Sequence, residues 1–240
     1  MEPVNFIDTH THILPGIDDG AKDLEESLLI LKDAIMAGVK EIILTPHFPY
    51  SGVEISKISY RFESFGETVS QRGMDVKLHL GAELMLCPEL PKLIKEDKRL
   101  TINSKGKYAL IEMPPFEIPI YASTVFFDML VDGVTPVWAH PERCYDVVDD
   151  YRVAYHYRDS GVLLQINAGS LLGMYGKKIR HTALALLKNG CGHIVASDVH
   201  RFNGVKTLLP EVFSHLIKIV GKASALDMVQ FTPAKVIHDC

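Results

Sequence analysis

The segment Asp8-Thr-His-Thr-His12 constrains this chain most, because it directly follows the apolar run at positions 4–7, which is typical of a buried strand. In a strand, His10 and His12 are two residues apart and point to the same side. Two imidazoles on one side of a strand end can hold one metal ion. The carboxylates Asp18 and Asp19 follow closely. The sequence therefore predicts a metal site whose remaining ligands come from later segments.

The composition is that of an ordinary globular protein. The chain has 240 residues, of which 47% are hydrophobic and 23% are charged. We find no internal repeat, low-complexity segment or linker, so we expect one domain spanning residues 1–240. The net charge of −5 argues against a nucleic-acid-binding surface. A single large domain with a real core is the expected organisation.

Several features favour a cytoplasmic protein. The four cysteines are scattered without CxxC spacing, as is usual for reduced thiols. The start Met1-Glu2-Pro3 runs straight into the first expected strand, so we expect no signal peptide. No apolar run approaches the roughly 20 residues of a membrane span, so we expect no membrane insertion.

Strand and helix patterns alternate along the chain. We expect seven strands, at positions 4–7, 41–45, 76–81, 108–111, 134–139, 162–166 and 194–196. Helices are expected at 23–38, within 51–72, and at 89–97, 121–131, 149–160, 178–188 and from 208 onward. This alternation predicts an α/β fold with a parallel sheet, and the apolar strands look buried on both faces.

Nearly every expected strand ends in a side chain that can bind a metal. In a closed α/β barrel the carboxyl ends of the strands meet on one face, where active sites are built. Imidazole and carboxylate ligands without thiolate suit Mn, Fe, Zn or Co, and this set is too large for one ion. Two or three ions sharing bridging carboxylates would activate water, which predicts hydrolysis, most naturally of a phosphoester. The strand-end residues are His10, His12, His47, Glu83, Glu112, His140, Asn167, Asp198 and His200.

Some of these residues also have a purely structural interpretation. Asp18 could belong to a simple Asp-Asp-Gly turn, and Arg143 could be an ordinary ion-pair partner. Asn167 could support the ligands or could hydrogen-bond a loop. The other histidines do not follow strands, and we interpret them as structural or surface residues: His79, His156, His181, His193, His215 and His238.

The order of motifs resembles the polymerase and histidinol phosphatase (PHP) superfamily. Within it, the chain is similar to the bacterial metal-dependent protein-tyrosine phosphatases of capsule and exopolysaccharide operons, the CpsB/YwqE type. The resemblance spans nearly the whole chain. The matching segments are Asp8 to Ala21, Thr45-Pro-His47, Gly81-Ala-Glu83, Ala139-His-Pro-Glu-Arg143, Gln165 to Leu171, and Ala196-Ser-Asp-Val-His200.

This resemblance implies a distorted (βα)7 barrel of the PHP type that holds three metal ions, with manganese, iron, zinc or cobalt as candidates. The implied sites are His10, His12, Glu83 and Asp198 for the first ion, Glu83, Glu112 and His140 for the second, and Asp18, His47 and His200 for the third. Arg143 would bind the phosphoryl oxygens, so Arg143, His47 and His200 are the expected catalytic residues.

The resemblance also implies a substrate and a partner. The substrate would be phosphotyrosine on the C-terminal tail of a bacterial tyrosine kinase that controls polysaccharide export, and association into homo-oligomers is compatible with it. The chain departs from the family pattern at Phe48-Pro49-Tyr50 and at Thr232-Pro233. A second substrate-binding arginine is expected after the Asp198-Val-His200 motif, where Arg201 and Lys206 are the candidates.

These departures leave two alternative functions open. The first is hydrolysis of a small phosphomonoester such as histidinol phosphate or a sugar phosphate, and the second is a non-catalytic phosphotyrosine-docking module. A cysteine-dependent phosphatase is excluded, because no cysteine is followed by an arginine six residues later. A serine hydrolase lacks its G-x-S-x-G motif. An amidohydrolase usually has a modified lysine where this chain has Glu112.

Overall fold

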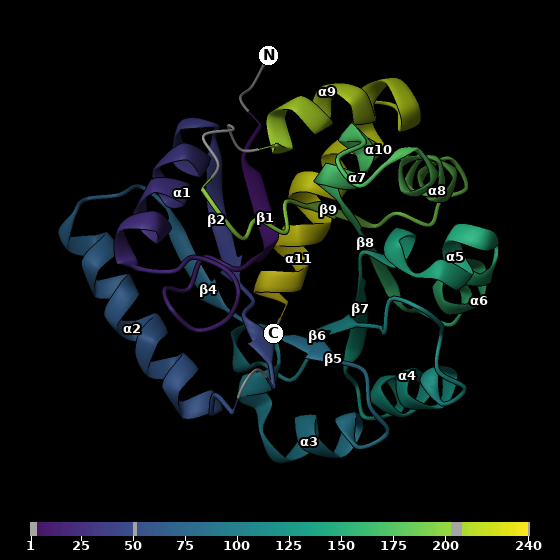
Figure 1. Ribbon diagram of the computed structural model, residues 1–240, viewed down its shortest axis with the longest axis horizontal. Helices are drawn as coiled ribbons and strands as arrows, with labels where there is room; N and C mark the ends of the chain where they lie inside the picture. The colour runs from purple at the N-terminus through teal and green to yellow at the C-terminus, as the bar shows by residue number, and fades with distance from the viewer. Residues whose placement is uncertain (1–3, 50–51, 203–207, 240) are drawn as a thin grey trace.

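Parallel strands alternate with helices throughout residues 4–49, 52–202 and 208–239, which the computed structural model describes (Figure 1). The strands form a three-stranded sheet, in the order β1-β2-β4, and a six-stranded sheet, in the order β3-β5-β6-β7-β8-β9. The described strands are β1 (Phe6–Thr11), β2 (Val39–Leu44), β3 (His47–Phe48), β4 (Lys77–Leu80), β5 (Glu83–Met85), β6 (Tyr108–Glu112), β7 (Thr135–Ala139), β8 (Leu163–Asn167) and β9 (Ile194–Ala196).

Two of the seven expected strands are each split in two, which produces the nine strands of the described part. Thr45-Pro46 separates β2 from β3, and Gly81-Ala82 separates β4 from β5. The proline has no N–H to donate to a ladder. Hydrogen bonds still cross the breaks, from Gly81 N to Leu44 O (2.9 Å) and from Glu83 N to Pro46 O (3.0 Å). The expected parallel α/β barrel is confirmed, and these breaks distort it.

Strand β1 is longer than the sequence predicts, because it continues through the Asp8-Thr-His-Thr segment. All six of its residues are buried, and Thr11 forms a parallel bridge with Val199. The backbone N–H of His12 donates to Val199 O, and the N–H of Asp198 donates to His10 O, both at 2.9 Å. These bonds join β1 to the segment after β9 and close the barrel beside the two histidines.

Helices cover the outside of the barrel. Asp23 caps α1, because its carboxylate accepts the N–H of Glu26 at 3.0 Å. The helix expected at 149–160 is α6, which begins only at Val153, whereas the short α5 before it was not expected. The carboxylate of Asp150 accepts the N–H of Arg152 in the turn between the two helices. No helix among the described residues is long and apolar enough to cross a membrane. The helices are α1 (Leu24–Met36), α2 (Ile55–Gln71), α3 (Leu90–Glu96), α4 (Ala122–Val131), α5 (Tyr145–Asp149), α6 (Val153–Asp159), α7 (Ala168–Leu172), α8 (Lys177–Lys188), α9 (Leu209–Val220), α10 (Lys222–Leu226) and α11 (Thr232–His238).

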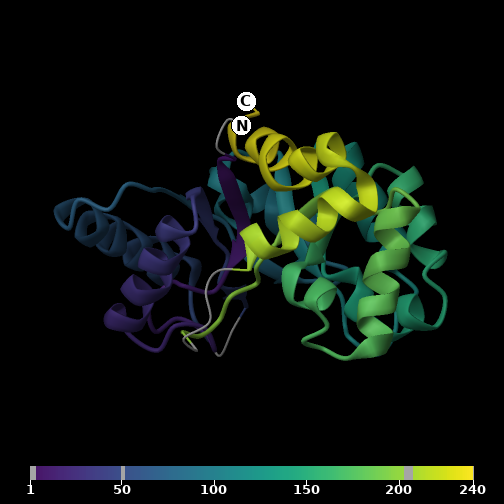
Figure 2. The ribbon, with the colours of Figure 1, turned by 90° about the horizontal axis from the view of Figure 1, so that it is seen from above.

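The C-terminal helix fills the amino end of the barrel. Val236 and Ile237 of α11 pack with Ile7, Leu110 and Val137, which are buried side chains of β1, β6 and β7. Figure 2 shows α11 and the helices before it at the side of the molecule where β1 begins. The apolar plug thus occupies one end of the barrel, and the carboxyl ends of the strands are left for polar side chains.

Candidate metal centre

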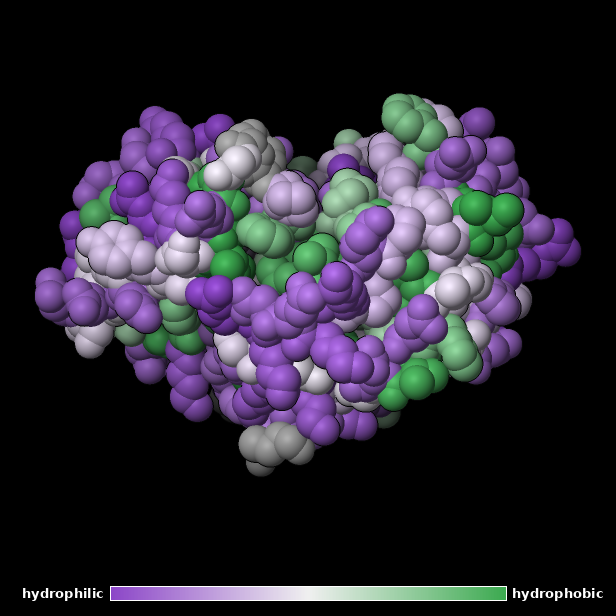
Figure 3. All heavy atoms as spheres, turned by 90° about the horizontal axis from the view of Figure 1, so that it is seen from below, coloured by the Kyte–Doolittle hydropathy of each residue, from purple (hydrophilic) through white to green (hydrophobic). Residues whose placement is uncertain are grey.

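The strand-end histidines and carboxylates expected from the sequence converge at the carboxyl end of the barrel. In the register of β3 and β5, His47 lies beside Glu83, and in that of β5 and β6, Met85 lies beside Glu112. Figure 3, which views the molecule from below, shows a notch between two shoulders in the upper edge of the surface. The converging residues are His10 and His12 from β1, His47 from β3, Glu83 from β5, Glu112 from β6, His140 after β7, and Asp198 and His200 after β9.

Glu83 is the centre of this group. Its Oε2 atom lies 3.3 Å from His10 Nε2, 3.2 Å from His12 Nε2 and 3.0 Å from His47 Nδ1. Its Oε1 atom lies 3.0 Å from His140 Nε2. The Glu83 side chain is 1% exposed, yet Oε2 is buried without a well-oriented hydrogen bond. A buried carboxylate oxygen among imidazole nitrogens and without a donor suits a bound cation, so these residues fit a metal site.

The four residues expected to hold the first ion lie together. Asp198 Oδ1 is 3.3 Å from His10 Nε2 and 3.5 Å from His12 Nε2, and the two Nε2 atoms are 3.1 Å apart. His140, expected at the second ion, lies 3.8 Å from Glu112 Oε1. His140 also groups with His10 and Asp198, whereas Glu112 groups with His47 and Glu83. The ligands of neighbouring sites are therefore interleaved, as expected for ions that share ligands.

The structure places Asp19, and not Asp18, among the ligands expected for the third ion. His12, Asp19, His47 and His200 form one compact group, in which Asp19 Oδ1 lies 3.6 Å from Nε2 of both His47 and His200. Both oxygens of Asp18 already accept hydrogen bonds, Oδ1 from Gly20 N at 3.0 Å and Oδ2 from His47 N at 3.0 Å. Asp18 thus lies beside the group as a hydrogen-bond acceptor of the turn, and Asp19 is the carboxylate that lies within it.

Hydrogen bonds on the outer side of the cluster orient the imidazoles. Asp18 Oδ2 lies 2.7 Å from His12 Nδ1, and Gln165 Oε1 lies 2.8 Å from His10 Nδ1. The backbone oxygen of Asp198 lies 2.9 Å from His200 Nδ1. These acceptors require a proton on Nδ1, so the neutral form of each ring directs an unprotonated Nε2 at the cluster. Metal-binding histidines are usually held in this way.

The cluster attracts positive charge. Burial lowers the pKa of His10, but the charges of Glu83 and Asp198 outweigh it and raise that pKa to about 9. Burial likewise lowers the pKa of His12, but bonds to Asp18 and Glu83 raise it to about 10. Without metal, the carboxylates draw protons onto the imidazoles, and metal cations can supply the same positive charge.

Two of the converging residues have strained backbones. His140 has φ 36° and Asp198 has φ 55°, a left-handed region that non-glycine residues rarely adopt. Each lies just after a strand that ends in a buried alanine. His140 directly follows Ala139, and Asp198 follows Ala196 after one serine. A tight reversal at these positions turns the side chains back over the barrel mouth. Strain of this kind concentrates at functional sites, where surrounding structure enforces it.

Arg143 and Asn167 both donate to Asp198. Arg143 Nη1 lies 3.0 Å and Asn167 Nδ2 lies 2.7 Å from Asp198 Oδ2. Asn167 Oδ1 also accepts the N–H of Gly169, so Asn167 supports the cluster and also caps α7. Of the two candidates for a second substrate-binding cation, Arg201 pairs with Glu26 at 3.2 Å, and Lys206 lies outside the described residues.

Other supporting residues were not identified from the sequence. Asp8 is fully buried and accepts the N–H of Ser197 at 3.0 Å, and burial raises its pKa to about 6. Glu142 accepts the N–H of Asn167 at 2.9 Å. Gln165 lies inside β8, where it looks like an ordinary strand residue. The sequence signals available were the place of Asp19 beside Asp18 in an acidic turn and the presence of the other three residues in the motif segments that carry the family resemblance.

The remaining histidines lie away from the cluster, as expected. His193 Nδ1 accepts the N–H of Leu164 at 2.9 Å, and His79 Nε2 lies 2.8 Å from Glu41 Oε2. His156 Nε2 lies 3.3 Å from the Ser123 hydroxyl. None of the groups of potential metal ligands among the described residues includes them.

Known proteins are similar to this chain in both sequence and fold. The family model "Capsular polysaccharide synthesis, CpsB/CapC" matches residues 6–238. The putative tyrosine-protein phosphatase CapC of Staphylococcus aureus is 32% identical over 212 residues, which cover 87% of this chain and 82% of that protein. The tyrosine-protein phosphatase YwqE of Bacillus subtilis is 35% identical over 200 residues, which cover 81% of this chain and 77% of that protein.

Solved structures agree with this relationship. A structure from a study of YwqE of Bacillus subtilis and CpsB of Streptococcus pneumoniae, described as unique metal-dependent tyrosine phosphatases, superposes with a TM-score of 0.90 and 28% identity, covering 97% of this chain and 94% of that one. A beta-aspartyl dipeptidase of Fervidobacterium islandicum shares only the fold, with a TM-score of 0.64 and 12% identity over 97% of this chain and 72% of that one. The barrel, its mouth of histidines and carboxylates and the match over residues 6–238 together establish that the chain belongs to the CpsB/CapC family.

Proposed function

We propose that this chain is a metal-dependent protein-tyrosine phosphatase. It hydrolyses phosphotyrosine on the tail of a bacterial tyrosine kinase and thereby takes part in controlling capsule or exopolysaccharide synthesis. The observation that carries the proposal is the buried Glu83 carboxylate, which lies within 3.3 Å of four imidazole nitrogens. Membership of a family whose curated relatives are named tyrosine-protein phosphatases supports it. We further propose a single domain that acts in the cytoplasm.

The cluster has the ligands for three ions, with manganese as the first candidate and iron, zinc and cobalt as the others. His10, His12, Glu83 and Asp198 would hold one, Glu112 and His140 would complete a second with Glu83, and Asp19, His47 and His200 would hold a third. When bound, such ions lower the pKa of coordinated water from about 15.7 towards about 7 and neutralise phosphoryl oxygens. The absence of thiolates favours these metals over a structural zinc site.

Three side chains on the open side of the cluster face an incoming phosphate. Arg143 is 37% exposed, and His47 and His200 are 22% and 30% exposed, whereas His10 and His12 are completely buried. The guanidinium of Arg143 is held at one nitrogen by Asp198, which leaves its other donors for phosphoryl oxygens. Arg143 therefore binds and orients the phosphoryl group and stabilises the charge that develops on it.

The leaving group of phosphotyrosine makes a modest demand on this site. A phenol has a pKa of about 10, so a phenolate leaves more readily than an alkoxide does. The site therefore needs to bind the phosphoryl group and activate water more than it needs a strong acid for the leaving oxygen.

The test combines metal analysis with turnover. Purified protein is analysed for bound metals, and hydrolysis of a phosphotyrosine peptide is measured before chelation, after chelation and after Mn²⁺ is restored. We expect turnover that is lost on chelation and regained with metal. Higher catalytic efficiency on histidinol phosphate or a sugar phosphate than on the peptide would contradict the proposal. Tight binding of the peptide without turnover would instead indicate a docking module.

A further inference from the structure

Tyr175 lies against the phosphate-binding arginine. The guanidinium carbon of Arg143 is 4.9 Å from the centroid of the Tyr175 ring, a distance at which a cation and an aromatic face attract each other. The same guanidinium donates from Nη1 to Asp198 Oδ2 at 3.0 Å. The ring and the carboxylate together fix the arginine head, so the aromatic ring is a built part of the rim.

The local sequence places this ring. Asn167 ends β8 and caps the short helix α7, and Gly173 ends that helix with φ 84°, a conformation suited to glycine. The chain then turns back and brings Tyr175 to the site. A Cβ atom on Gly169 would lie 3.0 Å from Cε2 of Tyr175 and 3.2 Å from Sδ of Met174. The glycine therefore leaves the space in which these two side chains approach the barrel.

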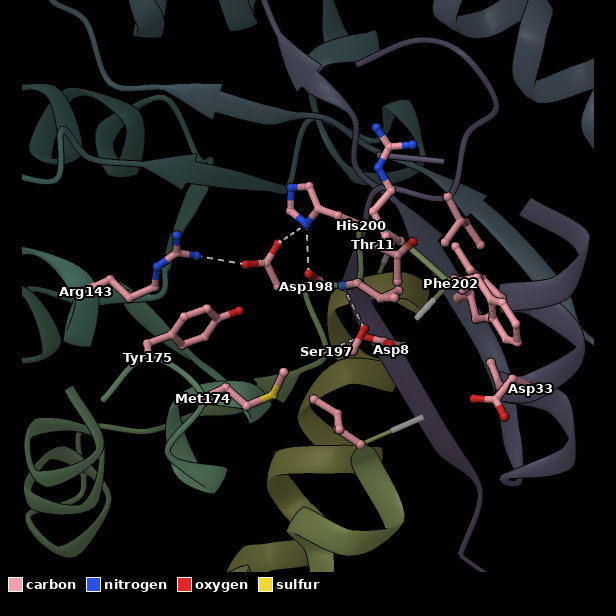
Figure 4. A pocket seen from close by; sticks show the side chains of 17 residues that line it. Asp8, Thr11, Asp33, Arg143, Met174, Tyr175, Ser197, Asp198, His200 and Phe202 are labelled. Atoms are coloured by element: carbon pink, nitrogen blue, oxygen red, sulfur yellow. Dashed lines mark hydrogen bonds and ion pairs between the residues drawn. The ribbon is translucent and has the colours of Figure 1, made fainter. Parts of the chain in front are cut away.

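A cavity of about 400 Å³ begins at Arg143 and Tyr175 and runs between β1, α1 and the segment after β9. Arg143, Met174 and Tyr175 line one side of it and Asp33 and Phe202 the other, with Asp198 between them (Figure 4). Figure 4 shows Tyr175 and Met174 directed into the cavity from the same side as Arg143. The volume lies within the range of about 300–1,000 Å³ typical of small-molecule sites.

An anion-binding end joined to an apolar, aromatic wall matches one kind of ligand. The phosphoryl group of an aryl phosphomonoester would meet Arg143 and the cluster, and its ring would meet Tyr175 and Met174. Aromatic rings attract each other at centroid separations of 4.5–7 Å, and thioethers also contact rings favourably. An alkyl phosphomonoester has no ring to place against this wall.

We propose that the cavity wall formed by Met174 and Tyr175 is the subsite for the aryl ring of the substrate, and that Tyr175 is a specificity-determining residue that selects aryl over alkyl phosphomonoesters. The proposal rests on the phosphotyrosine hydrolysis proposed above and goes further, because it assigns the ring of the substrate to a place in the fold. The hydroxyl of Tyr175 is not required for this role, whereas its ring is.

The test measures binding of two non-hydrolysable phosphonates to the Mn²⁺-loaded protein. Phenylphosphonate carries a ring and methylphosphonate does not, so the ratio of their inhibition constants reports the ring subsite. Inorganic phosphate measures the anion site alone. The variants are Tyr175→Leu, Tyr175→Phe and, as a matched control, Tyr155→Leu. Tyr155 also faces an arginine, at 4.8 Å from Arg158, but lies in the outer helix α6.

We expect Tyr175→Leu to reduce the preference for phenylphosphonate by roughly 2- to 10-fold, the worth of one aromatic contact. Tyr175→Phe and Tyr155→Leu should retain the wild-type ratio, and elemental analysis should find the metal content unchanged. An unchanged ratio in Tyr175→Leu, or equal weakening of both phosphonates and of phosphate, would overturn the subsite. If Tyr175→Leu does not fold, Met174→Ala tests the same wall by the same ratio.

The phosphotyrosine assay keeps the two proposals separate. Loss of preference in Tyr175→Leu together with no turnover of a phosphotyrosine peptide by the wild type would reject the proposed function and support the subsite. Turnover by the wild type together with an unchanged ratio in Tyr175→Leu would reject the subsite alone.

Discussion

Two clusters of histidine and carboxylate lie at opposite ends of the same barrel. The Glu83 cluster, at the carboxyl ends of the strands, contains the candidate metal ligands. The Glu41 cluster, at the other end, consists of Glu41 from β2, His79 from β4, His238 from α11 and Asn103. Glu41 Oε2 lies 2.8 Å from His79 Nε2 and 3.1 Å from His238 Nε2. Residue types alone do not distinguish the two clusters.

The clusters differ in how their polar atoms are satisfied. In the Glu41 cluster, His79 donates from Nε2 to the carboxylate and its Nδ1 accepts from Asn103 Nδ2 at 3.2 Å, so both ring nitrogens have partners. In the Glu83 cluster, the outer nitrogens of His10 and His12 are bound and the inner ones meet Glu83 Oε2, which has no hydrogen bond. A satisfied cluster needs no ligand, whereas a cluster with an orphaned buried oxygen does.

The sharpest way to break this comparison is to change the central carboxylate of each cluster to an amide. Glu83→Gln removes a bridging ligand and its charge, so we expect kcat to fall by on the order of 10³-fold or more, together with loss of metal. Glu41→Gln should leave kcat within about 2-fold of wild type and should cost stability only, about 1–2 kcal/mol. Phosphotyrosine-peptide turnover and elemental analysis measure both effects. Full metal content and turnover in Glu83→Gln would remove the distinction.

Arg143→Lys sharpens the comparison at the rim. Lysine keeps the positive charge but loses the planar fork and its stacking on Tyr175, so we expect kcat/KM to fall by about 10²-fold while metal content is retained. Arg158→Lys is the matched control, because Arg158 stacks on Tyr155 away from the cluster. Steady-state kinetics on the same peptide provide the measurement. Equal kinetics in both variants would argue against a role for Arg143 at the phosphate.

The adjacent aspartates test the assignment within the Glu83 cluster. Asp19→Asn should lower the number of bound ions by one, because Asp19 groups with His12, His47 and His200. Asp18→Asn should keep that number but weaken metal affinity by about 10- to 100-fold, because Asp18 orients His12 from outside. Metal titrations followed by elemental analysis separate the two results. Loss of an ion in Asp18→Asn with a full set in Asp19→Asn would restore the assignment made from sequence.

The sequence predicted the strand ends better than it predicted the details around them. His47, Glu83 and Asp198 were identified because each follows an apolar run, and parallel strands place such residues on one face. The choice between Asp18 and Asp19 was beyond sequence reasoning, because neighbouring residues in a turn differ only in the direction of their side chains. Gln165 was missed for a related reason, since its role depends on His10, which is far away in sequence.

The differences between the predicted and the observed boundaries of the strands and helices have the same origin. The two split strands and the extension of β1 depend on hydrogen bonds to distant segments, such as His12 N to Val199 O, which local patterns do not contain. The late start of α6 depends on a turn at Asp150, whose side-chain oxygen accepts the N–H of Arg152 and whose backbone oxygen accepts the N–H of Val153. Tertiary contacts and single capping bonds therefore decided the element boundaries, while periodicity decided the order of elements.

The smallest expected effect concerns the Glu41 cluster. Burial lowers the pKa of His79 and outweighs the attraction of Glu41, so the folded protein resists a proton that the unfolded chain accepts below about pH 6.5. Burial raises the pKa of Glu41, but hydrogen bonds from His79 and His238 outweigh it and lower that pKa. The ionised carboxylate therefore stabilises the fold, and this contribution is lost when acid protonates it. Both shifts make stability fall as the pH falls.

His79→Gln removes the first of these contributions. We expect a loss of about 1 kcal/mol at pH 7, seen as a melting temperature about 2–4 °C lower, and a smaller further decrease between pH 7 and pH 5.5 than in wild type. The Glu83 cluster titrates equally in both proteins, so its contribution cancels in the difference between the two melting curves. Turnover at 25 °C should be unchanged. Parallel melting temperatures across this pH range, or a loss of turnover, would mean that the two ends of the barrel are not as independent as their hydrogen bonds indicate.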